Sequence, residues 1–280
     1  MYTLAQSKRV RGSNGEPLPT VFRALEAKGI VFRRGQLVLV CAGPGTGKSA
    51  FILSYILKAA IPAMYFSADS DAFTQLVRSI SILKGWDLAR SAEMVLNEDL
   101  DSVEYDLADV PVRMNYDASP SLDRIEQSLQ SYFEVYEEFP SAIVVDNVTN
   151  VRAGGDNDED PFSGLESLMD YLHQMARETN AAVFGLHHVT GAYNDAAKPI
   201  PLSGVKGQIT RVPEMVLTMF RPDNLCVSGV KNRGGKADPS GEDFAELSFE
   251  GESMRIEDLP VLPGFDMQPD RRRDEEGMLG

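Results

Sequence analysis

Short apolar segments alternate with longer amphipathic segments along most of the chain. The short segments that carry mainly apolar side chains are residues 37–42, 62–67, 142–146 and 181–186, with a briefer one at 112–116. Apolar runs of this length are typical of parallel strands that helices cover on both faces. The pattern therefore predicts a parallel sheet at the centre of the protein.

Between these segments, apolar residues recur every three or four positions, as on one face of a helix. This spacing predicts helices within residues 21–28, 50–60, 73–80, 122–136 and 165–176. Three further strand-like runs follow at residues 216–220, 225–230 and 244–249. Because strands alternate with helices, we expect an α/β fold with an open, mainly parallel sheet flanked by helices.

The two ends of the chain differ from this central region. Residues 1–18 are basic and rich in turn-forming residues, so we expect a flexible arm. Residues 259–280 combine prolines with a dense run of charges, which is typical of a disordered tail. Residues 19–258 are expected to form the single folded domain.

The net charge of −15 is unevenly distributed. Residues 1–40 carry seven Lys and Arg against two Glu, a net +5, and residues 189–240 carry seven against four acidic residues, a net +3. A basic working surface for nucleic acid is compatible with this distribution, and so are solvated acidic loops on a soluble enzyme. The chain has no apolar run of membrane-spanning length and no secretory signal, so we expect a cytoplasmic protein without a membrane partner.

A glycine-rich turn joins the first apolar run to the helix that follows it. The turn reads Ala42, Gly43, Pro44, Gly45, Thr46, Gly47, Lys48 and Ser49. Glycine lets backbone N–H groups point inward as an anion-binding nest, and the start of the next helix adds its positive dipole. In such a phosphate-binding loop Lys48 would reach the β- and γ-phosphates of ATP, and Ser49 would hold Mg²⁺. Ala42 stands where the motif has its first glycine.

Carboxylates follow two of the apolar runs, at the sheet edge where the nucleotide would bind. Asp146 ends the run at 142–146, which matches the Walker B pattern, and its oxygen would share Mg²⁺ with Ser49. Asp69 follows the run at 62–67. It can serve in catalysis, whereas Asp71 is placed to cap the next helix.

With these motifs placed, residues 25–249 resemble the RecA-like ATPase domain of the DnaB-type hexameric replicative helicases. The resemblance lies in Arg34-Gly35-Gln36-Leu37, Phe66-Ser67-Ala68-Asp69, Gln75-Leu76-Val77-Arg78, Ile143-Val144-Val145-Asp146, Gly185-Leu186-His187-His188 and Lys231-Asn232-Arg233-Gly234. It implies a RecA-like P-loop NTPase with ATP and Mg²⁺ as cofactors, assembled as a hexameric ring. It further implies 5'-3' DNA helicase activity in replication.

The resemblance also implies roles for individual residues. Asp69 occupies the position of the catalytic glutamate that polarises the attacking water, although its side chain is shorter. His188 matches a polar sensor near the γ-phosphate, usually Gln. Lys231 and Arg233 match finger residues that a neighbouring subunit projects into the ATP site. Without the resemblance, this last segment would be interpreted as a basic hairpin turn.

Two loops of the family line a central channel and hold single-stranded DNA; here they correspond to residues 151–163 and 190–211. In the second loop Lys206 and Gly207 are the main candidates for a phosphate contact, with Lys198 and Arg211 behind them. The first loop offers only Arg152 against an acidic run. Because no set of aromatic residues is interleaved with these cations, we expect the protein to track the DNA backbone and not to stack on the bases.

The sequence leaves a second class of function open. A RecA- or RadA-like recombination filament, or a helicase loader or regulatory ATPase that uses ATP as a switch, would carry the same phosphate-binding and Walker B motifs. Only some twenty residues precede the resemblance, so no N-terminal primase-interacting domain is expected. Either partner recruitment differs, or this is a minimal motor of the kind that a phage or mobile element encodes. A primase or loader is the further partner that the resemblance implies.

Overall fold

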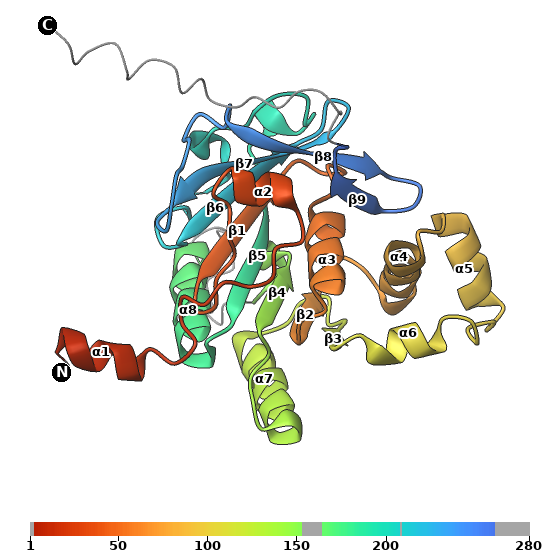
Figure 1. The fold of residues 1–280 in the computed structure, drawn as a ribbon, viewed down its shortest axis with the longest axis horizontal. Helices are drawn as coiled ribbons and strands as arrows, with labels where there is room; N and C mark the ends of the chain where they lie inside the picture. Colours follow the sequence, from red (N-terminus) through yellow and green to blue (C-terminus); the bar gives the residue numbers. More distant parts are fainter. Residues whose placement is uncertain (1–2, 153–163, 208, 261–280) are drawn as a thin grey trace, which may run out of the picture.

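The computed structural model describes residues 3–152, 164–207 and 209–260. At its centre lies a nine-stranded sheet in the order β3-β2-β4-β5-β1-β6-β7-β8-β9 (Figure 1). The parallel strands are β1 (Leu37–Ala42), β2 (Ala63–Ser67), β3 (Val112–Asn115), β4 (Ala142–Asp146), β5 (Ala182–His188) and β6 (Met215–Phe220). The strands β7 (Leu225–Asn232), β8 (Phe244–Glu250) and β9 (Arg255–Asp258) continue the sheet in antiparallel fashion. The predicted open, mainly parallel sheet is therefore confirmed.

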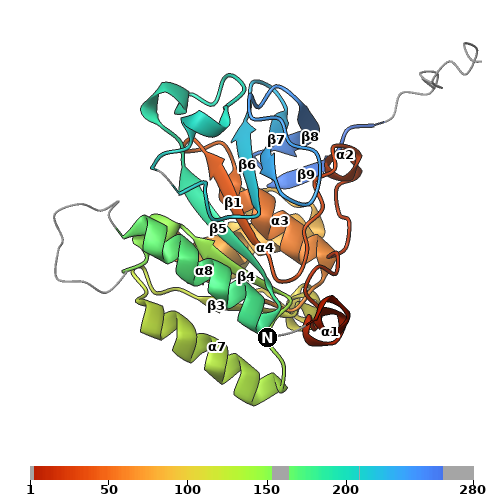
Figure 2. The ribbon, with the colours of Figure 1, turned by 90° about the vertical axis from the view of Figure 1, so that its left-hand side faces the viewer.

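Helices cover both faces of this sheet (Figure 2). One face packs against α2 (Arg23–Ala27) and α3 (Lys48–Ala59), and the other against α7 (Leu122–Tyr136) and α8 (Leu165–Thr179). The pleat of β1 separates the two layers, because Val38 and Val40 join the core of α3 while Leu37 and Leu39 join that of α8. Every side chain of β1 is buried, as the uninterrupted apolar run predicts.

The segment between β2 and β3 contains more helix than the sequence predicts. The expected helix is α4 (Ala72–Lys84), and Asp71 caps it by accepting a 2.8 Å hydrogen bond from the Thr74 amide. The acidic stretch that follows forms α5 (Leu88–Leu96) and α6 (Glu104–Asp109). The second has only six residues and buries none of them, so the sequence shows no apolar period there.

The arm before the domain also contains a helix, α1 (Leu4–Val10). No side chain of α1 is buried, so hydrophobic patterning could not reveal it. Its N-terminus is fixed locally by a capping box, in which Thr3 and Gln6 exchange hydrogen bonds. The flexibility of residues 1–18 stays a prediction, and the expected disordered tail lies, from residue 261 onward, outside the described residues.

The connection from β5 to β6 is not a featureless loop. It contains the short 3-10 helices η2 (Gly191–Tyr193) and η3 (Leu202–Gly204), and it buries Ile200 and Val205. Hydrogen bonds from Thr218 and Arg221 to carbonyls of this connection tie it to β6 and the residue that follows it. No helix in the described ranges is long and apolar enough to cross a membrane.

Candidate nucleotide-binding site

The glycine-rich turn lies between the carboxyl end of β1 and the first turn of α3. Gly45 and Gly47 adopt left-handed backbone angles, with φ of 73° and 110°, which favour glycine. A Cβ atom on Gly47 would also lie 2.8 Å from the Phe249 ring, and one on Gly43 would lie 2.7 Å from the Asn194 carbonyl oxygen. The glycines are thus required both by backbone conformation and by neighbours that pack against the turn.

Lys48 is the first residue of α3, and its side chain is buried at the turn. Burial lowers the pKa of Lys48, while the nearby carboxylates of Asp146 and Asp69 raise it. The first N–H groups of a helix have no acceptor within the helix, so they and Lys48 together offer positive charge and donors that suit an anion. The structure therefore brings the predicted phosphate-binding residues together in one concave turn.

Asp146 lies at the carboxyl end of β4, beside this turn. Burial raises the pKa of its carboxyl, and the hydroxyls of Ser49 and Tyr65 oppose that shift. Its Oδ2 accepts a 2.8 Å hydrogen bond from the Tyr65 hydroxyl, whereas Oδ1 is buried and meets no hydrogen-bond partner in the described part of the chain. The contact with Tyr65 could not be read from the sequence, where Tyr65 is one apolar residue of a strand.

These atoms suit a magnesium ion. Mg²⁺ keeps several water ligands and takes few from the protein, often one carboxylate plus phosphate oxygens of the substrate. The Ser49 hydroxyl and the unpaired Oδ1 of Asp146 provide two hard oxygen donors of this type. Within the described ranges no group of three or more His, Cys, Asp or Glu could hold a metal ion.

Asp69 lies after β2, next to the segment that follows β4. The side-chain amide of Asn147 donates to one of its oxygens, and that of Asn150 donates to the other at 3.2 Å. The same Asn147 amide lies 3.5 Å from Nε2 of His188. The structure therefore joins Asp69 and His188 through Asn147, a residue that sequence reasoning missed because an isolated Asn after a strand carries no motif.

A cavity of about 520 Å³ opens over the turn, and Lys48, Ser49, Asp69 and His188 all line it. Its outer wall contains Arg221, whose guanidinium lies 4.9 Å from the centre of the Phe249 ring. A cation stacked on an aromatic ring makes a flat surface that suits a nucleobase. Neither residue was predicted as part of the site. Arg221 follows β6 and Phe249 lies near the end of β8, and only folding of the sheet brings these strand ends to the cavity.

The predicted finger residues lie elsewhere, near the amino end of β1. Lys231 donates hydrogen bonds of 2.7 Å to the carbonyls of Thr210 and Arg211, and Arg233 donates one of 2.8 Å to the Arg211 carbonyl. Burial lowers the pKa of Lys231 to about 8, and neighbouring Arg233 adds to that effect. The structure brings these two cations together but separates them from the cavity of their own chain.

Glu214 ties the finger segment to the start of β1. Its carboxylate accepts from the Leu37 amide at 2.9 Å and contacts Nε2 of His173 at 2.7 Å. Its backbone carbonyl accepts a 2.9 Å hydrogen bond from the Arg233 amide, and its carboxylate lies 3.9 Å from the Arg233 guanidinium. Arg233 is thus held at the amino end of the strand whose carboxyl end carries Lys48.

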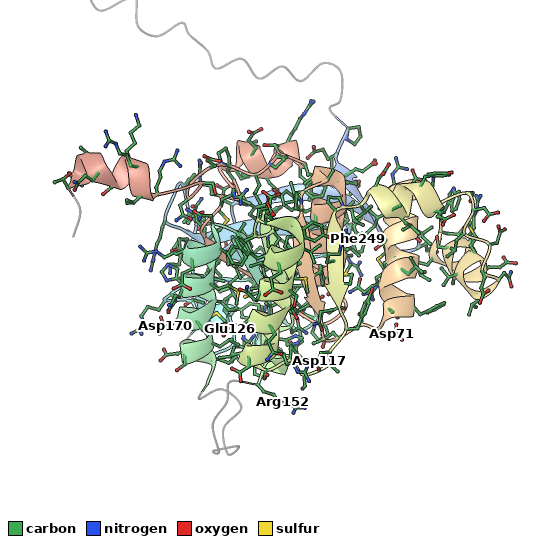
Figure 3. All side chains as sticks on the ribbon, turned by 90° about the horizontal axis from the view of Figure 1, so that it is seen from below. Asp71, Asp117, Glu126, Arg152, Asp170 and Phe249 are labelled. Carbon is green, nitrogen blue, oxygen red and sulfur yellow. The ribbon has the colours of Figure 1, made fainter. Side chains whose placement is uncertain are left out.

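The predicted DNA-binding residues fall into two groups. Lys198, Lys206, Gly207 and Arg211 are exposed in the connection after β5, whereas Arg152 is exposed beside the start of α7, where its amide donates to Pro120. Figure 3 shows the side of the molecule on which Arg152 lies, with the acidic side chains of Asp117, Glu126 and Asp170 on the same side. The remaining residues of the first predicted DNA loop, 153–163, lie outside the described residues.

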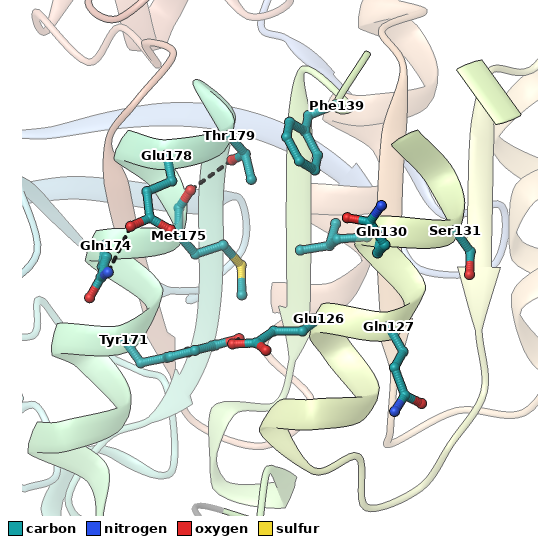
Figure 4. A pocket seen from close by; sticks show the side chains of 11 residues that line it. Glu126, Gln127, Gln130, Ser131, Phe139, Tyr171, Gln174, Met175, Glu178 and Thr179 are labelled. Atoms are coloured by element: carbon teal, nitrogen blue, oxygen red, sulfur yellow. Dashed lines mark hydrogen bonds between the residues drawn. The ribbon is translucent and has the colours of Figure 1, made fainter. Parts of the chain in front are cut away.

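A larger groove of about 990 Å³ runs between α7 and α8, away from the phosphate-binding turn (Figure 4). Tyr171 and Glu126 bridge it with a 2.8 Å hydrogen bond. None of the predicted site residues lines this groove. The predicted site residues Lys48, Ser49, Asp69 and His188 line the smaller cavity at the carboxyl end of β1 instead.

Comparisons with known proteins agree with this geometry. Residues 17–243 match the family model of the DnaB-like helicase C terminal domain. Two curated relatives, both called Gene 65 protein, come from Mycobacterium phages L5 and D29. The chain is 62% identical to the L5 protein over 266 residues, covering 92% of this chain and 99% of the relative. It is also 62% identical to the D29 protein over 230 residues, covering 80% and 99%.

Solved structures share the fold at much lower identity. One of them, described as an ATPase domain, matches with a TM-score of 0.72 at 17% identity, covering 92% of this chain and 96% of that one. A DnaB-like replicative helicase, studied for its interactions with primase, matches with a TM-score of 0.71 at 17% identity, and 91% of this chain covers 65% of that one. The protein therefore belongs to the DnaB-like helicase C-terminal domain family and has the RecA-type ATPase fold of these replicative helicases.

Proposed function

We propose that this protein works as a ring-shaped homo-oligomer, in which ATP is hydrolysed between neighbouring subunits to drive movement along single-stranded DNA and unwind the duplex. The observation that carries the proposal is the separation of Arg233 from Lys48 within one chain. β1 has six residues, so its two ends lie about 20 Å apart. Because the finger and the phosphate-binding turn lie at opposite ends, Arg233 would act on the nucleotide of an adjacent subunit.

The proposed chemistry assigns a task to each side chain of the cavity. The first N–H groups of α3 and Lys48 would bind the phosphates, and Ser49 and Asp146 would hold Mg²⁺, which would supply positive charge to offset that of the phosphates. Asp69 orients the attacking water and accepts its proton. His188 lines the cavity on the side of Asp69, which supports a role in sensing the γ-phosphate.

The finger completes the site from the neighbouring subunit. A guanidinium at the transferred phosphoryl group stabilises the charge that develops there, and such a group can contribute about 10³ to 10⁵ in rate. To reach it, Lys231 and Arg233 would exchange their present contacts with the Thr210 and Arg211 carbonyls for phosphate oxygens. Those carbonyls are neutral acceptors, so charged phosphate is a stronger competitor for the two cations.

The base would lie against Phe249 and Arg221 at the outer wall of the cavity. This surface offers stacking without hydrogen bonds from the ring, so we propose weak discrimination among purine nucleotides. The phosphates and ribose would provide most of the affinity. Arg78, which also lines the cavity and donates to the Ser70 hydroxyl at 3.1 Å, would add positive charge nearby.

We propose that Lys206 and Gly207 contact the DNA backbone, with Lys198 and Arg211 adding positive charge and Arg152 a weaker contribution. All five are exposed, and phosphate contacts by Lys and Arg provide affinity without reading sequence. The connection that carries the first four packs against the phosphate-binding turn, because Asn194 approaches Gly43 closely. That contact supports communication between bound DNA and the nucleotide.

The test is ATP turnover measured against protein concentration and against added oligonucleotide. The proposal predicts that turnover per subunit rises with concentration until rings are complete, and rises again with single-stranded DNA. Turnover independent of both would contradict it. A primase or loader is the further partner that we propose, by likeness to the helicase studied with primase; co-sedimentation with a primase from a related phage would test that association separately.

A further inference from the structure

Tyr65 and Asp146 form a buried pair on two neighbouring strands of the sheet. Tyr65 is 0% exposed and Asp146 is 1% exposed. They lie on the neighbouring parallel strands β2 and β4, whose register pairs Ser67 with Asp146 at their carboxyl ends. The Tyr65 hydroxyl donates its hydrogen bond of 2.8 Å to Oδ2 of the carboxylate.

This hydrogen bond makes the two carboxylate oxygens of Asp146 different. Oδ2 is satisfied from inside the sheet, while Oδ1 is buried without a partner in the described residues and is left for a ligand. The backbone of Asp146 is fixed as well, since its carbonyl accepts from the Ala68 amide at 2.8 Å and from the Asp69 amide at 3.3 Å. The remaining freedom is rotation of the carboxylate, which the Tyr65 hydroxyl restricts.

Resting on the proposed function, we propose that Tyr65 is a positioning residue for Mg²⁺, because its hydroxyl orients the Asp146 carboxylate toward the ion. Hydrogen-bond partners of metal ligands set the orientation of those ligands, and removing one typically costs 10- to 100-fold in metal affinity or activity. The alternative role is structural, in which the hydroxyl only satisfies a buried carboxylate. The two roles differ in what they predict for metal binding.

Tyr65→Phe removes the hydroxyl and keeps the ring that packs in the core. The matched control is Tyr55→Phe, since Tyr55 is also buried and donates its hydroxyl to the Pro19 carbonyl at 3.1 Å. Binding of a fluorescent ADP analogue is titrated with Mg²⁺ for wild type and both variants. Binding without metal, in EDTA, and the thermal unfolding midpoint are measured beside it.

We expect Tyr65→Phe to raise the half-saturating Mg²⁺ concentration about 10-fold while binding in EDTA is unchanged, and Tyr55→Phe to leave both as in wild type. A half-saturating concentration within twofold of wild type would overturn the inference, as would an equal loss of binding in EDTA. If wild-type binding does not depend on Mg²⁺, the proposed ATPase site itself fails. Mg²⁺-dependent wild-type binding with an unaffected Tyr65→Phe variant overturns only the role of Tyr65.

Discussion

Lys48 and Arg233 lie at opposite ends of the same strand, β1. Lys48 follows its carboxyl end through the phosphate-binding turn, and Arg233 is bonded through Glu214 to Leu37 at its amino end. The proposed finger and the phosphate-binding turn therefore lie on different parts of the surface of one chain.

Replacement of Asp69 by Asn should nearly abolish ATP turnover. The amide cannot accept a proton from water, and a positioned general base typically contributes 10²- to 10⁴-fold. Nucleotide affinity should stay within about threefold of wild type, because Asp69 lines the cavity outside the phosphate-binding turn. Single-turnover hydrolysis with equilibrium binding separates the two quantities, and Asp71→Asn is the control, since Asp71 caps α4. Full activity of Asp69→Asn would contradict the role of a base.

The pair of Phe249 and Arg221 should contribute to nucleotide affinity. Phe249→Ala removes the stacking surface, and base–aromatic stacking is worth about 1–3 kcal/mol, so KM for ATP should rise about 5- to 150-fold. The control is Tyr105→Ala on α6, where the side chain is 83% exposed. This variant should leave KM for ATP unchanged. Steady-state kinetics at saturating DNA provide the measurement. An unchanged KM would show that the base lies elsewhere.

His187 should make the protein less stable in acid. Its Nε2 donates to the Lys206 carbonyl at 2.7 Å, and burial lowers its pKa to about 4, with His188, Lys48 and Lys206 adding to the effect. In the unfolded chain the pKa is about 6.5, so between these values only the unfolded state takes up the proton, and stability falls as pH decreases. The loss approaches about 3 kcal/mol by pH 4.

His187→Gln removes this titration. Urea unfolding at several pH values should show a flatter dependence between pH 6.5 and pH 4 than the wild type shows. Parallel curves for the two proteins would contradict the account. Because His188 and both lysines are present in each protein, the difference between the curves reports on His187 alone.

Lys206→Ala should weaken binding of single-stranded DNA regardless of its sequence. Loss of one phosphate contact on a single strand should reduce the slope of log K against log salt by about 0.7. Lys84→Ala is the matched control. Lys84 ends α4 and pairs with Asp106 on α6, and neither helix is part of the predicted DNA surface. Fluorescence anisotropy at several salt concentrations measures both effects, and equal slopes for wild type and Lys206→Ala would exclude this contact.

Much of the fold could be predicted from the sequence because its strands are buried on both faces. Runs such as residues 142–146 favour a covered parallel strand, and the turn that ends in Lys48 and Ser49 predicts a phosphate-binding loop between a strand and a helix. Helices α1 and α6 were missed, since they bury no side chain and so leave no apolar pattern in the sequence.

The residues that complete the site were predicted less well. Tyr65 belongs to an apolar strand, and this pattern gives no sign that its hydroxyl donates to Asp146. Asn147, which donates to Asp69, follows the Walker B carboxylate and belongs to no motif. Phe249 reaches the phosphate-binding turn only because the antiparallel strands extend the sheet beyond β6. Contacts between strands far apart in the sequence carry no local signal.

Mixing two inactive variants tests the composite site most directly. Lys48→Ala lacks a working phosphate-binding turn but keeps its finger, and Arg233→Ala has the opposite defect. In a random equal mixture, about a quarter of the interfaces would combine the intact turn of one variant with the intact finger of the other. The account predicts that the mixture recovers up to about a quarter of wild-type ATP turnover while each variant alone is inactive. A mixture as inactive as its components, although the two variants assemble together, would contradict it.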